Sequence, residues 1–229
     1  MSVLKEFRQR RGCYKMIGIV DYGMGNLHSV SKALERLELD YILTDNIEEL
    51  KKVDGLLLPG VGAFPDAMKT LNEMGLSDFL REWAESGKPL LGICLGMQLL
   101  FEESTEHGET TGLGLLPGRV ERFVGHDANG VKYKVPHMGW NKLEFHQPDQ
   151  PLLQDVEEGH VYFVHSYVVK TEAEDVLLAT SEYDVTVPAV VGRNNVLGTQ
   201  FHPEKSSHVG MAILRNFGEL VTQGGEVRE

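Results

Sequence analysis

The fold of this chain is decided by the stretch Pro89-Leu90-Leu91-Gly92-Ile93-Cys94-Leu95-Gly96-Met97-Gln98. Its pattern predicts a buried strand that runs directly into a helix, with Cys94 at the bend and a glycine two positions away on each side. Glycine has no Cβ, so backbone can pass close to such a strained turn. The free N–H groups of the following helix would favour a thiolate and could bind an oxyanion. Taken alone, Cys94 is equally well explained as a small buried hydrophobic residue.

The composition is that of an ordinary globular protein. The chain has 229 residues, of which 41% are hydrophobic and 24% are charged. A single α/β domain of this size would bury roughly 70–75% of its unfolded surface. Lys and Arg number 22 against 34 Asp and Glu, and the net charge of −12 opposes binding to nucleic-acid phosphates. We therefore expect neither a nucleic-acid partner nor a membrane.

The cysteines and the N-terminal segment indicate a reducing compartment. Cys13 and Cys94 form neither a disulfide framework nor a metal-ligand pattern, so we expect a cytoplasmic protein without a bound metal. Residues 1–15 are basic but lack the apolar core of a signal peptide. We interpret them as a loosely ordered extension, with Met16 as the functional beginning and residues 16–229 as a single domain.

The first half of the chain alternates between strand and helix patterns. Strands are predicted at residues 16–20, 41–44 and 55–58. Helices are predicted at residues 46–52, 65–74 and 77–86. A further helix is predicted where Leu27, Val30, Leu34 and Leu37 recur at helical spacing. This alternation predicts an α/β fold with a doubly wound, largely parallel open sheet and flanking helices.

After Gly118 the pattern changes to short β-rich segments. Residues 119–124, 140–145 and 161–169 are predicted strands, separated by glycine and proline turns, and we expect them to add antiparallel strands to the sheet. Residues 196–201 form the predicted last strand. The closing helix carries Val209, Ala212, Ile213, Phe217 and Leu220 on one face.

A second chemical motif, His202-Pro203-Glu204, ends the last strand. Proline favours an extended residue before it, and side chains two apart on extended backbone share a face, so His202 and Glu204 should meet. Cys94 should lie at the same edge of the sheet. The three residues then match a nucleophile, a base and a carboxylate that orients the base. On its own this motif is better explained as an exposed polar loop, and a metal site has too few ligands.

Residues 58–62, Leu-Pro-Gly-Val-Gly, could supply oxyanion donors at the end of another strand. Pro-Gly after a strand is also ordinary turn chemistry. Joined to the cysteine turn and to His202, the segment completes a site for acyl transfer.

These motifs together resemble those of a known enzyme family. The Cys94 turn and His202-Pro203-Glu204 are similar to the motifs of class I (triad) glutamine amidotransferases, from about Met16 to the end. Finer motifs resemble the glutaminase subunits of imidazole glycerol phosphate synthases: residues 21–27 (DYGMGNL), 58–64 (LPGVGAF), 136–141 (PHMGWN), 165–167 (HSY) and 202–206 (HPEKS).

The resemblance implies hydrolysis of L-glutamine through a thioester on Cys94, without a cofactor. The ammonia would pass to a (β/α)₈-barrel cyclase subunit that closes the imidazole ring in histidine biosynthesis. By the same analogy the oxyanion donors are the N–H groups of Gly62 and Leu95, and glutamine is held by Gly60, Gln98, Glu106, Ser166 and Tyr167. The partner interface would contain Asn26, Met138, Trp140, Tyr162 and Lys205, although the two aromatic residues could equally be core and Lys205 a solvated charge.

Three alternatives remain at this point. The chain could be the glutaminase of another pathway, a cysteine hydrolase that acts alone on γ-glutamyl compounds or peptides, or a non-catalytic binding protein. Release of glutamate and ammonia from free glutamine would distinguish a glutaminase from a cysteine hydrolase that acts alone. Alkylation of Cys94 would test whether the chain is a non-catalytic binding protein.

Overall fold

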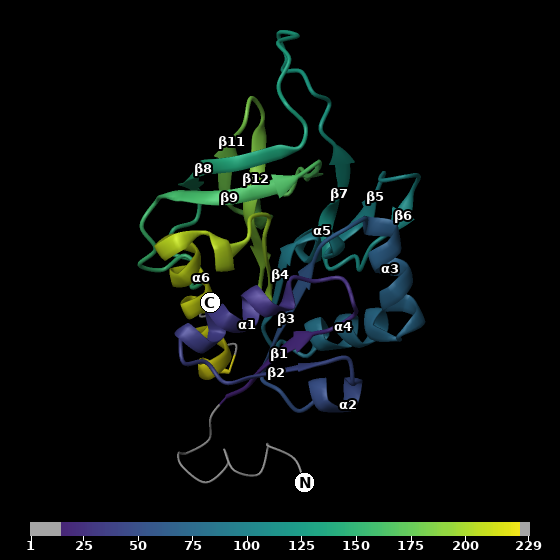
Figure 1. Cartoon of the computed structure of the whole chain (residues 1–229), viewed down its shortest axis with the longest axis vertical. Helices are drawn as coiled ribbons and strands as arrows, with labels where there is room; N and C mark the ends of the chain where they lie inside the picture. Colours follow the sequence, from purple (N-terminus) through teal and green to yellow (C-terminus); the bar gives the residue numbers. More distant parts are fainter. Residues whose placement is uncertain (1–14, 225–229) are drawn as a thin grey trace.

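A nine-stranded sheet forms the centre of the computed structural model, which describes residues 15–224 (Figure 1). The strand order is β2-β1-β3-β4-β13-β12-β11-β8-β9. The parallel strands are β2 (Tyr41–Thr44), β1 (Ile17–Val20), β3 (Gly55–Gly60), β4 (Leu90–Cys94) and β13 (Val196–Thr199). Antiparallel strands extend them: β12 (Thr186–Arg193), β11 (Leu177–Glu182), β8 (His137–Phe145) and β9 (His160–His165). The predicted fold class is confirmed.

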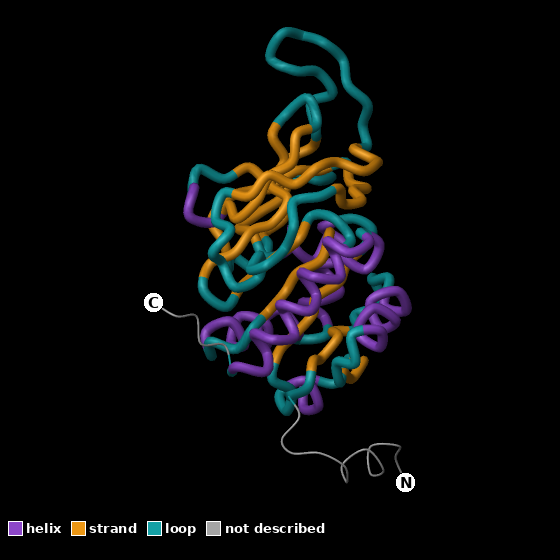
Figure 2. Tube along the Cα trace, turned by 90° about the vertical axis from the view of Figure 1, so that its left-hand side faces the viewer, coloured by secondary structure: helices purple, strands orange, loops and turns teal. Residues whose placement is uncertain are grey.

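Helices cover both faces of the parallel strands. Successive side chains of a strand point to opposite faces, and on these strands both sets are apolar, so each face packs against helices. Leu57 of β3 belongs to the same core cluster as residues of α1 (Leu27–Arg36) and α6 (Ser207–Gln223). Its neighbours Leu56 and Leu58 pack on the other face, against α3 (Phe64–Glu73) and α4 (Leu76–Glu85). Helix α2 (Ile47–Leu50) contributes Leu50 to that second cluster. Figure 2 shows the helices gathered around one part of the chain and a strand-rich part beyond them.

A second sheet, which the sequence did not predict, has the order β10-β7-β5-β6. Its strands are β10 (Tyr167–Lys170), β7 (Leu116–Arg122), β5 (Phe101–Ser104) and β6 (Thr110–Thr111). The expectation of one strand over residues 161–169 is therefore wrong, because the chain leaves the large sheet at Ser166 and enters the small one. The expected strand at 119–124 also belongs to the small sheet. The residues on both sides of His165 and Ser166 are rich in valine and aromatic side chains typical of strands, so the pattern did not reveal the change of sheet.

The other predicted elements agree with the structure to within a few residues. The strands β11 and β12 and the short helix η3 (Glu174–Val176) had no predicted counterpart. The segment between β7 and β8 projects from one end of the molecule (Figure 1). No helix within residues 15–224 combines the length and apolar character needed to cross a membrane.

The predicted N-terminal extension is mostly outside the described part of the chain, as is Cys13. Its last residue, Lys15, lies in the described part, where its Nζ is 3.1 Å from Oδ1 of Asp54.

Candidate active site

Cys94 lies at the sharp turn between β4 and α5 (Leu95–Leu99). Its backbone φ of 56° and ψ of −112° are unusual for a residue with a side chain, which is the strain expected of a nucleophile at such a turn. The predicted reason for the neighbouring glycines is confirmed. A Cβ on Gly96 would lie 1.7 Å from the Leu58 carbonyl oxygen, and one on Gly92 would lie 2.6 Å from the Gly96 oxygen. Helix α5 therefore packs directly on the backbone of β3.

His202 and Glu204 form the second part of the site. The imidazole Nδ1 of His202 lies 2.9 Å from Oε1 of Glu204, and His202 is buried. The predicted contact is thus present, but its predicted backbone is wrong. His202 is extended, whereas Glu204 belongs to the short helix η4 (Pro203–Lys205). The turn, and not an extended chain, brings the carboxylate back to the imidazole.

The electrostatics of His202 favour its protonated form. Burial alone would lower the pKa of His202, but hydrogen bonds to Cys94 and Glu204, with their negative charges, outweigh burial and raise the pKa to about 9. A protonated imidazole beside Cys94 can deliver its proton to a leaving group. The arrangement has the parts needed for nucleophilic attack on a carbonyl carbon.

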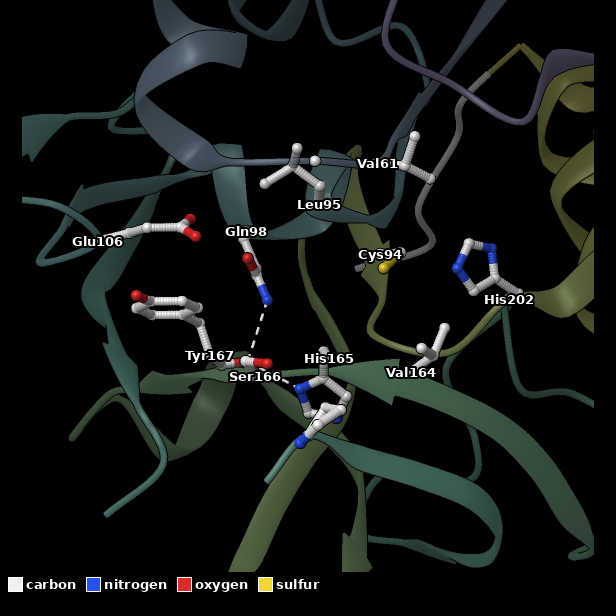
Figure 3. A pocket seen from close by; sticks show the side chains of 12 residues that line it. Val61, Cys94, Leu95, Gln98, Glu106, Val164, His165, Ser166, Tyr167 and His202 are labelled. Atoms are coloured by element: carbon white, nitrogen blue, oxygen red, sulfur yellow. Dashed lines mark hydrogen bonds between the residues drawn. The ribbon is translucent and has the colours of Figure 1, made fainter. Parts of the chain in front are cut away.

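A cavity of about 420 Å³ opens at this cysteine (Figure 3). It brings together eight of the sequence-predicted site residues: Gly62, Cys94, Leu95, Gln98, Glu106, Ser166, Tyr167 and His202. Glu204 lies behind His202 and does not line the cavity. Gly60 is buried at the end of β3, opposite Cys94 in the strand register, and does not line it either.

The predicted oxyanion donors border the cavity from two sides. Leu95 is the first residue of α5, so its N–H has no partner within the helix. Gly62 has a φ of 100°, a conformation that glycine adopts readily. The N–H of the preceding Val61 donates to the Met24 carbonyl at 3.0 Å. The roles of Gly62 and Leu95 stay predictions.

Gln98 and Glu106 use part of their hydrogen-bonding capacity within the protein. Gln98 Nε2 donates to the Tyr167 carbonyl at 3.1 Å and to Gln200 Oε1 at 3.0 Å, which leaves its Oε1 for a ligand. Glu106 Oε2 accepts from the Phe64 N–H at 2.8 Å, at the start of α3. Its second oxygen can receive a cationic group of a ligand.

The sequence missed four residues that line the cavity: Val61, Pro136, Val164 and His165. His165 belonged to the quoted HSY motif, but only its two neighbours were assigned a role. Ser166 and Tyr167 line the cavity because the chain passes from β9 to β10 at this point, where the predicted single strand is divided in two.

The predicted interface residues lie on neighbouring elements. Trp140 and Tyr162 are cross-strand partners on β8 and β9 with ring centroids 5.9 Å apart. Trp140 is 52% exposed and Met138 58%, so neither is a core residue. Lys205 is exposed on η4, which contacts both β9 and α1, and Asn26 is half-buried at the start of α1.

Within residues 15–224, no group of three or more His, Cys, Asp or Glu side chains is arranged to hold a metal ion.

Comparison with known proteins identifies close relatives over nearly the whole chain. The family model for glutamine amidotransferase class-I matches residues 18–220. The imidazole glycerol phosphate synthase subunit HisH of Halalkalibacterium halodurans is 70% identical over 213 residues, covering 93% of this chain and 100% of the relative. The subunit of the same name from Bacillus subtilis is 55% identical over 208 residues, covering 91% and 98%. A crystal structure of a glutamine amidotransferase matches with a TM-score of 0.70 and 27% identity, over 90% of this chain and 98% of that one.

Proposed function

Because this chain belongs to the glutamine amidotransferase class-I family, and within it to the family of imidazole glycerol phosphate synthase subunit HisH, we propose that it hydrolyses L-glutamine for that synthase. Glutamine and water yield glutamate and ammonia, and the ammonia is used in histidine biosynthesis. The observation that carries the proposal is the contact of Cys94 and Glu204 with one buried imidazole, His202, at a cavity.

In the first half of the reaction, the Cys94 sulfur attacks the side-chain amide carbon of glutamine. The amide oxygen becomes an oxyanion, for which the N–H groups of Leu95 and Gly62 are the donors. The His202 imidazolium then gives its proton to the leaving nitrogen, the carbon–nitrogen bond breaks, and ammonia leaves behind a thioester.

In the second half, neutral His202 accepts a proton from a water molecule that attacks the thioester. The carbon–sulfur bond breaks, glutamate leaves, and the Cys94 thiolate and the His202 imidazolium are restored. Glu204 keeps the imidazole oriented and stabilises its positive charge in both halves.

The remaining cavity residues recognise the amino-acid end of glutamine. The free Glu106 oxygen suits an α-ammonium group. The Ser166–Tyr167 turn and the Gln98 oxygen lie at the same end of the cavity (Figure 3) and provide further polar contacts.

The partner is the cyclase subunit of the synthase, which we propose is a (β/α)₈ barrel. It docks on the face carrying Asn26, Met138, Trp140, Tyr162 and Lys205. A large exposed tryptophan beside apolar side chains is typical of the centre of a protein interface. We propose a cytoplasmic heterodimer.

The test is synthesis by the assembled pair with two nitrogen sources. Cys94→Ala should abolish glutamine-dependent synthesis and leave synthesis from added ammonium salt intact, because only the glutamine route needs the thioester. Loss of both activities in a folded, associated variant would contradict a division of labour between two sites.

A further inference from the structure

The Tyr167 carbonyl oxygen receives two hydrogen bonds from side chains at the wall of the cavity. Gln98 Nε2 donates to it at 3.1 Å, and His165 Nδ1 lies 2.7 Å from it (Figure 3). A carbonyl oxygen can only accept, so the His165 proton is on Nδ1. Tyr167 is the first residue of β10, directly after the change of sheet at Ser166. Its position therefore depends on side chains as well as on strand pairing.

His165 is itself held by a second buried histidine. The two residues are cross-strand partners, and His137 Nδ1 lies 2.9 Å from His165 Nε2. His137 is fully buried and stacked between two rings, with centroids 4.5 Å from Phe163 and 3.9 Å from Tyr183. The imidazole of His137 is thus fixed on both faces and can fix His165 in turn.

The number of ring protons on the two histidines shows that the hydrogen bond from His165 to the Tyr167 carbonyl is always present. Beyond the pair, His137 Nε2 lies 2.9 Å from Asn141 Oδ1, and the Asn141 amide nitrogen donates to the Glu182 carbonyl at 2.9 Å. Three hydrogen bonds from Tyr167 to Asn141 need three ring protons, whereas two neutral imidazoles carry two. Burial lowers the pKa of His165 to about 3 and also lowers that of His137, so the pair is neutral at pH 7. The single His137 proton is shared between two acceptors, whereas the His165 proton stays on Nδ1, in the hydrogen bond to the Tyr167 carbonyl.

From this geometry we propose that His165, held by His137, is a positioning residue that fixes the Ser166–Tyr167 turn in the shape that binds glutamine. The inference rests on the proposed function and assigns it a further residue. His165 acts on the binding of the amino-acid end, and Cys94 and His202 perform the chemistry. A change at His165 should therefore raise the KM for glutamine far more than it lowers kcat.

Three substitutions separate the hydrogen bond from the bulk of the ring. His165→Leu removes the donor to Tyr167. His165→Asn keeps an N–H close to the place of Nδ1. His137→Phe keeps the stack on Phe163 and Tyr183 and removes the support of His165. The matched control is His146→Leu, which removes a histidine that contacts Thr180 Oγ1 at 2.7 Å and lies outside the cavity.

The experiment measures two kinds of rate on the assembled pair. Glutamine hydrolysis gives KM and kcat. Labelling of Cys94 by a chloromethyl ketone analogue of glutamine requires the binding turn, whereas alkylation by iodoacetamide requires only the thiol. We expect His165→Leu to raise KM and slow analogue labelling by about tenfold, the effect of losing one hydrogen bond. Alkylation by iodoacetamide should be unchanged, His165→Asn should recover most of the loss, and His146→Leu should behave as the unaltered protein.

Two results would overturn the proposal. One is an unchanged KM in His165→Leu, or in His137→Phe if the first variant does not fold. The other is an equal fall in kcat, analogue labelling and alkylation together with the melting temperature, which indicates a purely structural role. If the unaltered pair neither hydrolyses glutamine nor reacts with the analogue, the proposed function itself fails, and that result does not depend on the variants.

Discussion

The backbone N–H of His202 donates a hydrogen bond to the carbonyl oxygen of Tyr162 at 3.2 Å. The backbone of the catalytic histidine is therefore hydrogen-bonded to β9, the strand that carries part of the proposed partner face. Ser206 strengthens this link: its Oγ donates to the His202 carbonyl at 2.6 Å and accepts from the Tyr162 N–H at 3.0 Å. A displacement of β9 would move the base of the reaction.

Ser206→Ala should lower both stability and glutamine hydrolysis. Ser206 is fully buried, and its loss leaves the Tyr162 N–H without the Ser206 acceptor. The His202 carbonyl loses one of its two donors, because the Lys205 N–H still donates to it at 3.0 Å. The change should cost about 1–3 kcal/mol of unfolding free energy. Ser181→Ala is the matched control, because that buried serine donates to the Lys142 carbonyl at 2.8 Å, away from the site. Denaturant unfolding and hydrolysis rates measure the two effects. Equal loss of activity in both variants would show that Ser206 has no specific influence on His202.

The raised pKa of His202 predicts how stability depends on pH. The folded-state pKa of about 9 exceeds the ordinary value of 6.5, so the unfolded chain loses this proton first as pH rises. The stabilisation is full below pH 6.5 and is lost as pH rises through about 9. Glu204→Gln removes one of the charges that raise the pKa of His202, so the stabilisation should be smaller and its loss should be complete at a lower pH. Unfolding free energies between pH 6 and pH 10 provide the measurement, and identical pH profiles would contradict the coupling.

Substitutions of His202 and of Glu204 should differ in their effect on activity. His202→Ala should lower kcat by several orders of magnitude, because the residue is part of one catalytic unit with Cys94. Glu204→Gln should have a smaller effect, because an amide oxygen can still accept from Nδ1. The comparison is of glutamine hydrolysis by each assembled pair. A Glu204→Gln loss as large as that of His202→Ala would assign Glu204 more than an orienting role.

Trp140→Ala should weaken association with the cyclase subunit by about 2 kcal/mol if Trp140 is a central anchor. Leu43→Ala is a suitable control, since Leu43 is also exposed but belongs to β2, at the opposite edge of the large sheet from β9. Titration of the partner gives both affinities, and melting temperatures check that the variants fold. A folded Trp140→Ala variant with unchanged affinity would refute the placement of the interface.

The sequence was informative where sterics or short-range chemistry determine the structure. The strand, the turn and the close packing around Cys94 follow from an apolar run and from glycines at two places where a Cβ has no room. The contact between His202 and Glu204 was also predicted, although a short helical turn produces it.

Long-range pairing was less accessible. Nothing in the periodicity of residues 161–169 distinguishes one strand from two strands in different sheets, because a side chain's face does not reveal which strand pairs with it. That split places Ser166 and Tyr167 in the cavity and gives His165 its carbonyl partner. The role proposed for His165 could therefore be inferred only from the structure.

The peptide between Val61 and Gly62 leads to the last prediction, that hydrolysis is slow until the partner is bound and loaded with its nucleotide substrate. The Val61 N–H donates to the Met24 carbonyl, so the start of this loop is held in place. Gly62 has a φ of 100°, a conformation that lets the Val61–Gly62 peptide turn about its ends. Turning its carbonyl inward would place a negative dipole at the oxyanion, and loss of one oxyanion donor costs about 10²–10³ in rate. The partner would select the competent state by contacting this loop differently in the two states. Hydrolysis should therefore rise by about that factor from the free chain to the loaded pair.

Gly62→Ala, whose Cβ would lie 3.0 Å from Met24 Cε, should reduce this rise in hydrolysis. Gly87→Ala is the control, because Gly87 also has a positive φ, 77°, but has open space around it, so this variant should show the full rise. Full activity in the free chain would mean that the loop is no gate and that Cys94 is always competent.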